Sequence, residues 1–292
     1  NFPTVESPNP EERKTMSMAI DLAKKVKADL VLATDPDSDR IGVAMPDENG
    51  EYVLLNGNQT LVLLMTYQLT RWAELGRLNG HQYVIKTIVT TEMVDAVADY
   101  FKVKCYECLT GFKYIAKIIR GHEGTDMQYI GGGEESFGYL AGDYVRDKDG
   151  VDGAYMICEM FSYYAIKGIS LLDKLDELYK AYGYCLNTLH SYEFDGSAGF
   201  AKMQSIMQAF RGDTKEFCGK KVVKLLDYAP GLDGLPKSDV LKFLLEDNCS
   251  IVVRPSGTEP KLKTYISVSA ENKEAAEKVE AEIRKSAEEF LK

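Results

Sequence analysis

Three loops of this 292-residue sequence carry residue types that could bind ions or sugars. Residues 35–40 read Asp-Pro-Asp-Ser-Asp-Arg, so carboxylates stand at Asp35, Asp37 and Asp39. In an extended loop, side chains two residues apart point roughly the same way. Hard cations such as Mg²⁺ prefer clusters of oxygen ligands, and three acids without a cation would repel one another. The spacing therefore predicts a metal site.

Two other interpretations of this loop are a calcium-binding EF-hand and a solvated acidic turn. A calcium-binding EF-hand is excluded, because the sixth position is Arg40 instead of glycine and the twelfth is Pro46 instead of glutamate. A solvated acidic turn would need no cation. The loop directly follows a short apolar segment, residues 30–33, which predicts a buried strand. Ligands of α/β sheets bind where strands end, and this position favours the metal site.

The second loop, residues 131–138, reads Gly-Gly-Gly-Glu-Glu-Ser-Phe-Gly. It has neither the Gly-Lys-Ser/Thr of a Walker loop nor the glycine spacing of a dinucleotide fingerprint. Glycines let the backbone approach a ligand closely. The carboxylate of Glu134 and the hydroxyl of Ser136 suit vicinal sugar hydroxyls, which both donate and accept hydrogen bonds. An ordinary turn with surface acids fits this loop equally well.

The third loop begins at Arg254 and is followed by Lys263. A tight turn between two predicted strands would gather backbone N–H groups, hydroxyls and a guanidinium, which together suit a phosphate. The chain has a formal net charge of -10, so an anionic ligand needs such a local concentration of positive charge. A plain hairpin with a surface arginine is the alternative. The remaining candidate ligands are Ser256, Gly257 and Thr258.

Three modules are predicted to position these loops. A helix starting at Asn9-Pro10 and the strand at 30–33 form an α/β half-unit that lacks a preceding strand. Strands and helices then alternate from 83 to 167, which predicts a mostly parallel sheet. The last third predicts antiparallel strands and an amphipathic C-terminal helix. The fold class is therefore α/β: two mixed, mostly parallel modules, the first incomplete, and a C-terminal α+β domain with an antiparallel sheet.

Composition excludes several other classes of protein. The chain is 45% hydrophobic and 27% charged, as in ordinary globular proteins. It has no apolar run of about 18 residues and no signal-peptide pattern, so we expect no membrane span. Its negative charge disfavours a nucleic-acid partner. Cys105 and Cys108 form a C-x-x-C within a predicted strand, which favours reduced structural thiols over a zinc or redox site. A cytoplasmic location fits best.

Taken together in this order, the three loops resemble those of the α-D-phosphohexomutase family, which includes phosphoglucomutases and phosphomannomutases. The resemblance extends over nearly the whole chain. It implies Mg²⁺ at the three aspartates, sugar recognition by Glu134 and Ser136, and binding of the non-reacting phosphate by the Arg254 loop. It also implies that Arg40 lies near the reacting phosphate. Lys86 and Lys113 resemble lysines of the family's active-site cleft, although surface or snorkelling lysines would explain both as well.

The chain also departs from the family's pattern. Members have four domains, and the first carries a catalytic serine in a Ser-His-Asn-Pro segment that is absent from this sequence. The resemblance implies a missing N-terminal domain, then part of domain 2 (1–48), domain 3 (49–186) and domain 4 (187–292). The parent would interconvert hexose 1-phosphate and hexose 6-phosphate, with glucose preferred and mannose next, through a phosphoserine and a hexose bisphosphate. This chain alone is expected to bind without turnover.

Two alternative enzyme classes remain at this point. A haloacid-dehalogenase-like phosphatase would use Asp35 as nucleophile and Asp37 as acid, although it would want Thr or Val where Asp39 stands and would leave the Arg254 loop unexplained. Within the resembled family, phosphopentomutase and phosphoglucosamine mutase are the other candidate activities. The Glu-Glu-Ser-Phe-Gly version of the second loop resembles phosphoglucomutases with phosphopentomutase relatives more than glucosamine-phosphate mutases.

Overall fold

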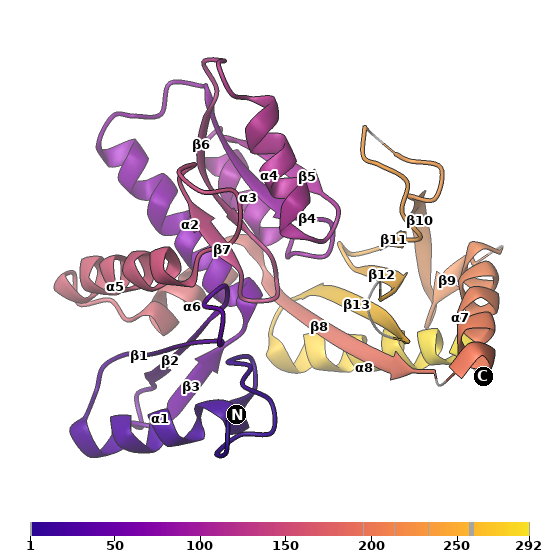
Figure 1. Cartoon of the computed structure of the whole chain (residues 1–292), viewed down its shortest axis with the longest axis horizontal. Coiled ribbons are helices and arrows are strands. Elements are labelled where there is room, and N and C mark those ends of the chain that lie inside the picture. The colour runs from indigo at the N-terminus through magenta and orange to yellow at the C-terminus, as the bar shows by residue number, and fades with distance from the viewer. Residues whose placement is uncertain (1, 195, 213, 233, 257–259, 292) are drawn as a thin grey trace. The chain divides into compact units, whose positions relative to one another are not determined.

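The chain divides into two units, Asn1–Leu178 and Tyr179–Lys292. In Figure 1 the first unit is coloured from indigo to magenta and the second from orange to yellow. The predicted domain limits at 48/49 and 186/187 stay predictions.

Among the described residues, no helix combines the length and the apolar character needed to cross a membrane. The computed structural model describes residues 2–194, 196–212, 214–232, 234–256 and 260–291.

The first unit begins with helix α1 (Arg13–Val26) on a three-stranded sheet in the order β1-β2-β3. Its strands are β1 (Val31–Thr34), β2 (Ile41–Pro46) and β3 (Tyr52–Leu55). All pairs are antiparallel, because the connecting loops are too short for the crossover that parallel strands require. The small core joins Met16, Ile20 and Ala23 of α1 to Val31, Ala44 and Tyr52 of the sheet.

Helix α1 starts later than predicted. The sequence suggested a start at Asn9-Pro10, but the first helical residue is Arg13. Asn9 forms a turn instead, because its side chain accepts the N–H of Glu11 at 3.1 Å and its carbonyl accepts the N–H of Glu12 at 3.1 Å. The turn leaves Glu11 outside the helix, and its carboxylate contacts Arg40.

The second sheet of this unit has the order β5-β4-β6-β7. β4 is parallel to both β5 and β6, and β7 is antiparallel to β6. Strand-helix-strand connections produce this parallel core, as the alternation in the sequence predicts. The strands are β4 (Gln82–Thr87), β5 (Lys104–Cys108), β6 (Gln128–Gly133) and β7 (Tyr139–Ala141), and the helices are α2 (Gly57–Glu74), α3 (Met93–Tyr100), α4 (Phe112–Gly121), α5 (Gly150–Ile166) and α6 (Leu171–Tyr182).

The second unit is built on a six-stranded sheet in the order β8-β13-β12-β11-β10-β9, with every neighbouring pair antiparallel. Alternate residues of β13, including Leu262, Ile266 and Val268, are buried in one core with residues of α7 and α8. The elements are β8 (Tyr184–Glu193), α7 (Gly196–Arg211), β9 (Glu216–Phe217), β10 (Lys220–Asp227), β11 (Leu241–Leu245), β12 (Ser250–Pro255), β13 (Lys261–Ala270), α8 (Lys273–Glu288) and a 3₁₀ turn (Glu289–Leu291).

The predicted fold class is confirmed: α/β architecture with a parallel sheet is followed by an antiparallel C-terminal sheet. Parallel pairing occurs in the second sheet, whereas the described strands of the first sheet are antiparallel. The loops singled out in the sequence follow strand ends. Residues 35–40 follow β1, residues 134–138 follow β6, and the β12–β13 turn begins after Pro255.

The six cysteines give an early test of the fold. Cys105 and Cys108 lie on strand β5, as the sequence predicts, and Cys108 is buried, whereas Cys158 is exposed on α5. Burial raises the pKa of Cys108 to about 12. Only the thiolate is nucleophilic, so we expect iodoacetamide at pH 8 to modify Cys158 at least about 100-fold faster than Cys108, measured by peptide mass spectrometry. The difference should vanish in urea. Equal native rates would contradict this burial.

Candidate functional site

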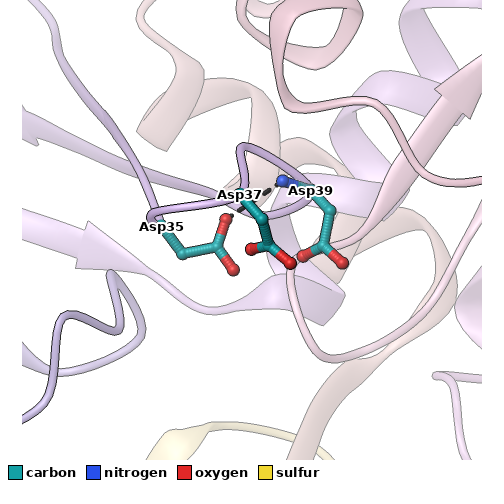
Figure 2. A group of neighbouring side chains, drawn as sticks. All are labelled: Asp35, Asp37 and Asp39. Carbon is teal, nitrogen blue, oxygen red and sulfur yellow. Dashed lines mark hydrogen bonds between the residues drawn. The ribbon is translucent and has the colours of Figure 1, made fainter.

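Residues 35–40 form a tight loop that gathers three carboxylates. Ser38 adopts a left-handed backbone (φ 57°), and its N–H donates to the carbonyl of Asp35 at 3.1 Å. The carboxylate of Asp35 then accepts the N–H groups of Asp39 and Arg40, each at 3.0 Å; the first of these bonds is dashed in Figure 2. As a result, one oxygen from each of the three aspartates lies within 4.8 Å of the others.

The electrostatics of this loop suit a hard cation. Burial raises the pKa of Asp35, opposed by the N–H of Arg40 and reinforced by the charge of Asp39. Among the described residues, Asp39 Oδ1 is buried without a hydrogen-bond partner, and Arg40 Nε is 3.8 Å from it. Buried acceptors normally find a partner. A divalent cation would satisfy this oxygen and offset the clustered negative charge, so the residues present fit Mg²⁺.

Arg40 closes one side of the acidic loop. Its Nη1 donates to Glu11 Oε1 at 3.0 Å, and its Nε is 3.8 Å from Asp35 Oδ2. Glu11 therefore orients a residue that was predicted to be catalytic. No local pattern in the sequence indicates this contact, because it depends on the turn that precedes α1.

The loop at 134–138 lies against the acidic loop. Phe137 has a left-handed backbone (φ 64°), and its carbonyl oxygen accepts the N–H of Ile41 at 3.1 Å. Glu134 is buried, and its Oε1 accepts the N–H of Gly111 at 2.8 Å. Burial raises the pKa of Glu134, while the Gly111 N–H and the positive charges of Lys148 and Arg40 act in the opposite direction. Ser136 is half-buried in the same loop.

The glycine run before Glu134 has a structural explanation beside the functional one. A Cβ at Gly132 would lie 2.5 Å from the carbonyl oxygen of Ile85, and one at Gly133 would lie 2.7 Å from that of Gly138. Real Cβ atoms do not approach so closely. The glycines therefore let β6 pack against its neighbours and let the loop turn back on itself, in addition to any room they leave for a ligand.

Lys148 joins the two loops, and sequence reasoning missed it. Its Nζ lies 2.6 Å from Asp39 Oδ2, and its charge acts on Glu134. The only hint in the sequence was a lysine among acids, Arg146-Asp147-Lys148-Asp149, directly before a helix. That pattern is common on solvated surfaces, so it did not single out the residue.

The two lysines implied by the resemblance occupy different settings. Lys113 is exposed in the first turn of α4, two residues after Gly111, with Nζ 5.0 Å from the ring of Tyr114. Lys86 is fully buried instead. Its Nζ lies 2.8 Å from Glu92, 2.8 Å from Asp95 and 3.2 Å from Glu107. Burial alone would lower the pKa of Lys86, but these carboxylates raise it above its ordinary value.

The predicted phosphate loop lies in the second unit. Arg254 on β12 pairs across the sheet with Lys263 on β13, and its Nη2 donates to the hydroxyl of Tyr265 at 3.2 Å. Its Nε is buried without a hydrogen-bond partner among the described residues. The N–H of Ser256 donates to the carbonyl of Lys261 at 2.7 Å and closes the described part of the turn. Gly257 and Thr258 lie outside the described residues.

Arg254 is therefore held in place and still has an unsatisfied donor. Its guanidinium carbon lies 5.7 Å from the centroid of the Tyr265 ring. The ring and the hydroxyl of this one tyrosine therefore both contact the guanidinium, the hydroxyl through Nη2. A guanidinium with a donor left over can bind a phosphate oxygen, which is the role predicted for it.

Comparison with known proteins assigns this arrangement to a family. Models of three phosphoglucomutase/phosphomannomutase domains match the chain: alpha/beta/alpha domain II at residues 1–50, alpha/beta/alpha domain III at 56–182 and the C-terminal domain at 197–286. A phosphoglucomutase of Staphylococcus aureus strain MSSA476 is 38% identical over 296 aligned positions, which cover 97% of this chain and 52% of that protein. The chain thus spans about half the length of the curated relatives it matches.

Solved structures agree on the fold. A phosphoglucomutase from Paramecium, pp63/parafusin, matches with a TM-score of 0.66 at 18% identity, covering 96% of this chain and 50% of that one. An Aspergillus fumigatus N-acetylphosphoglucosamine mutase in complex with GlcNAc-6P and magnesium matches with a TM-score of 0.52 at 12% identity, covering 94% and 53%. The matched family differs from the haloacid-dehalogenase class that the acidic loop alone left open. The chain belongs to the phosphoglucomutase/phosphomannomutase family.

Proposed function

We propose that this chain supplies the magnesium, sugar and phosphate subsites of a hexose-phosphate mutase. The observation that carries the proposal is the convergence of Asp35, Asp37 and Asp39 within 4.8 Å, beside a loop that holds Glu134. The family and the S. aureus phosphoglucomutase relative support a hexose phosphate as the substrate, with glucose preferred. Mannose phosphate is the next candidate.

Each subsite has a role in phosphoryl transfer. Mg²⁺, when bound by the three aspartates, would withdraw charge from the transferring phosphoryl group, and Arg40 would add positive charge beside it. Glu134 and Ser136 would hydrogen-bond sugar hydroxyls. Catalysis of this kind depends mainly on positioning and charge stabilisation, so a strong general base is not required.

The full reaction needs a serine that this chain does not contain in the family's motif. We propose that the sugar hydroxyl takes the phosphoryl group from a phosphoserine of a longer parent protein, forming a P–O bond to the sugar as the bond to serine breaks. The bisphosphate formed would turn end for end and return its other phosphate to serine.

Lys86 stays a predicted catalytic residue, but its three carboxylate partners favour a role in holding β4, β5 and α3 together. Lys113 remains the better placed of the two lysines to meet a ligand.

A coupled mutase assay tests the function directly. The parent protein and this chain would be compared with Mg²⁺ and a trace of glucose 1,6-bisphosphate, on glucose 1-phosphate and on mannose 1-phosphate. We expect turnover by the parent only, faster on glucose 1-phosphate. Absence of turnover by the parent on both sugars would overturn the proposal, and turnover by this chain alone would overturn its inactivity.

The phosphate subsite gives a separate prediction. Arg254→Ala in the parent is expected to raise KM for glucose 1-phosphate by about 100-fold, because a charge-assisted contact to the non-reacting phosphate is lost. Steady-state kinetics would measure KM and kcat separately. Arg284→Ala removes a half-exposed arginine from α8 of the same unit and should leave KM within about twofold. An unchanged KM for Arg254→Ala would refute its role in phosphate binding.

A further inference from the structure

We propose that Lys148 is a positioning residue of the metal site: its ammonium binds the carboxylate of Asp39 and competes with a divalent cation for it. This inference rests on the proposed function, because it requires that the three aspartates bind a cation. It adds a residue that neither the sequence motif nor the family match assigns.

The contacts of Lys148 place its charge within the site. Nζ lies 2.6 Å from Asp39 Oδ2 and 3.9 Å from Asp147 Oδ1. The side chain is only 17% exposed, so the pair with Asp39 is shielded from solvent much more than an ordinary surface ion pair. The two oxygens of Asp39 are therefore unequal: Oδ2 is bound by the ammonium, whereas Oδ1 is buried without a hydrogen bond among the described residues.

The backbone directly after Lys148 is fixed to the site. The N–H of Asp149 donates to the carbonyl of Tyr139 at 2.9 Å, and the N–H of Gly150 donates to the carbonyl of Ser38 at 2.8 Å, inside the acidic loop. A Cβ at Gly150 would lie 2.6 Å from that same carbonyl oxygen, so only glycine allows this approach. These bonds hold the Cα of Lys148 in place, so the position of its ammonium depends on the side-chain torsion angles alone.

The stem of Lys148 runs across the second loop. A Cβ at Gly138 would lie 2.5 Å from Cδ of Lys148 and 3.5 Å from its Cε, so the glycine leaves the space that the stem fills. The path leads past Glu134, whose charge acts on the ammonium together with those of Asp39 and Asp147. A lysine stem has several rotatable bonds. The ammonium can therefore leave Asp39 and still remain near a second carboxylate.

Competition follows from these contacts. A divalent cation among Asp35, Asp37 and Asp39 would repel the ammonium that lies 2.6 Å from Asp39 Oδ2, and the two cations would share the charge of one carboxylate. Binding of the cation must therefore weaken or break the Lys148–Asp39 pair. Without Lys148, the cation would meet one repelling charge fewer, and only the more distant Arg40, with Nε 3.8 Å from Asp39 Oδ1, would remain.

Metal titration of the chain tests this without an activity measurement. Mn²⁺ serves as the probe, and the free ion is followed by electron paramagnetic resonance. We expect Lys148→Met to bind Mn²⁺ about tenfold more tightly than the unchanged chain. Lys148→Gln should behave alike, whereas Lys148→Arg, which keeps the charge, should stay within about threefold. Lys104→Met removes the same charge from exposed Lys104 on β5 and should leave the affinity unchanged.

Each outcome decides between the proposals. Unchanged or weaker Mn²⁺ binding in both Lys148→Met and Lys148→Gln, with their thermal unfolding still cooperative, would overturn competition by Lys148 and leave the metal site intact. Equal tightening by Lys104→Met would show a general effect of net charge and would also overturn it. The proposed metal site fails if the unchanged chain does not bind Mn²⁺, or if Asp37→Ala binds it equally well. This inference then fails with it.

Discussion

Asp37→Ala is expected to weaken Mn²⁺ or Mg²⁺ binding by at least about 100-fold and to lower turnover of the parent by about a thousandfold or more. Asp37 is the best single test of the three aspartates because it is exposed. Asp35, by contrast, accepts the N–H groups of Asp39 and Arg40, so its loss would also unfold the loop. Metal titration of this chain and steady-state kinetics of the parent would measure the two effects.

The control for this variant removes the same charge elsewhere. Asp21→Ala changes an exposed aspartate on α1, and we expect both metal affinity and turnover to stay within about twofold of the unchanged protein. Normal metal binding by Asp37→Ala would show that the three carboxylates gather for another reason. If Asp37→Ala lost metal binding but kept normal turnover, the reaction would not need the cation at this site.

Lys86→Met is expected to lower the free energy of unfolding by about 3 kcal/mol, because it removes the ammonium that the carboxylates of Glu92, Asp95 and Glu107 share and leaves their mutual repulsion. The methionine fills most of the lysine's volume, so cavity formation contributes little. The three carboxylates are themselves between 36% and 48% exposed, which keeps the cost below that of fully buried acids. Urea denaturation of the chain would measure the loss.

Two further measurements separate the charge effect from a packing effect. Lys86→Met combined with Glu92→Gln should be more stable than Lys86→Met alone, because one of the repelling charges is removed. The difference from the unchanged protein should also narrow as the pH falls from about 7 to about 5. Burial and the charge of Glu92 raise the pKa of Asp95, and Lys86 opposes both. Without Lys86 this folded-state pKa rises further, so the folded variant gains a proton before the unfolded chain does. A pH-independent loss with no rescue would refute the electrostatic explanation.

The sequence predicted the elements whose hydrophobic pattern has a clear period. The alternation of strands and helices predicted from 83 to 167 is found from β4, which begins at Gln82, to α5, which ends at Ile166. Helix α2 was not predicted, although it is the longest in the described chain. Twelve of its thirteen residues from Gly57 to Leu69 are buried, so it shows no polar face, and periodicity cannot distinguish such a segment from other buried structure. Its capping box, Asn56 with Gln59, was the local signal that could have revealed it.

The candidate site was predictable where its residues are adjacent in the sequence. The spacing of Asp35, Asp37 and Asp39 was enough to predict that they converge, because the geometry is local. Glu11 and Lys148 contribute through contacts that span 29 and 109 positions of the chain, and no local pattern encodes those. The setting of Lys86 was equally hidden, since its partners come from the next helix and the next strand.

The hydrogen bond from Gly150 to Ser38 has a consequence for folding autonomy. Together with the bond from Ile41 to the carbonyl of Phe137, it fastens the small N-terminal sheet to a segment about a hundred positions later in the chain. A peptide ending near residue 50 would lose both bonds and strand β3, and it would keep only five of the six core residues, without Tyr52. The two sheets of the first unit should therefore melt in one cooperative transition. In this chain, the limit between the regions matched by the domain II and domain III models would then not separate two independently stable parts.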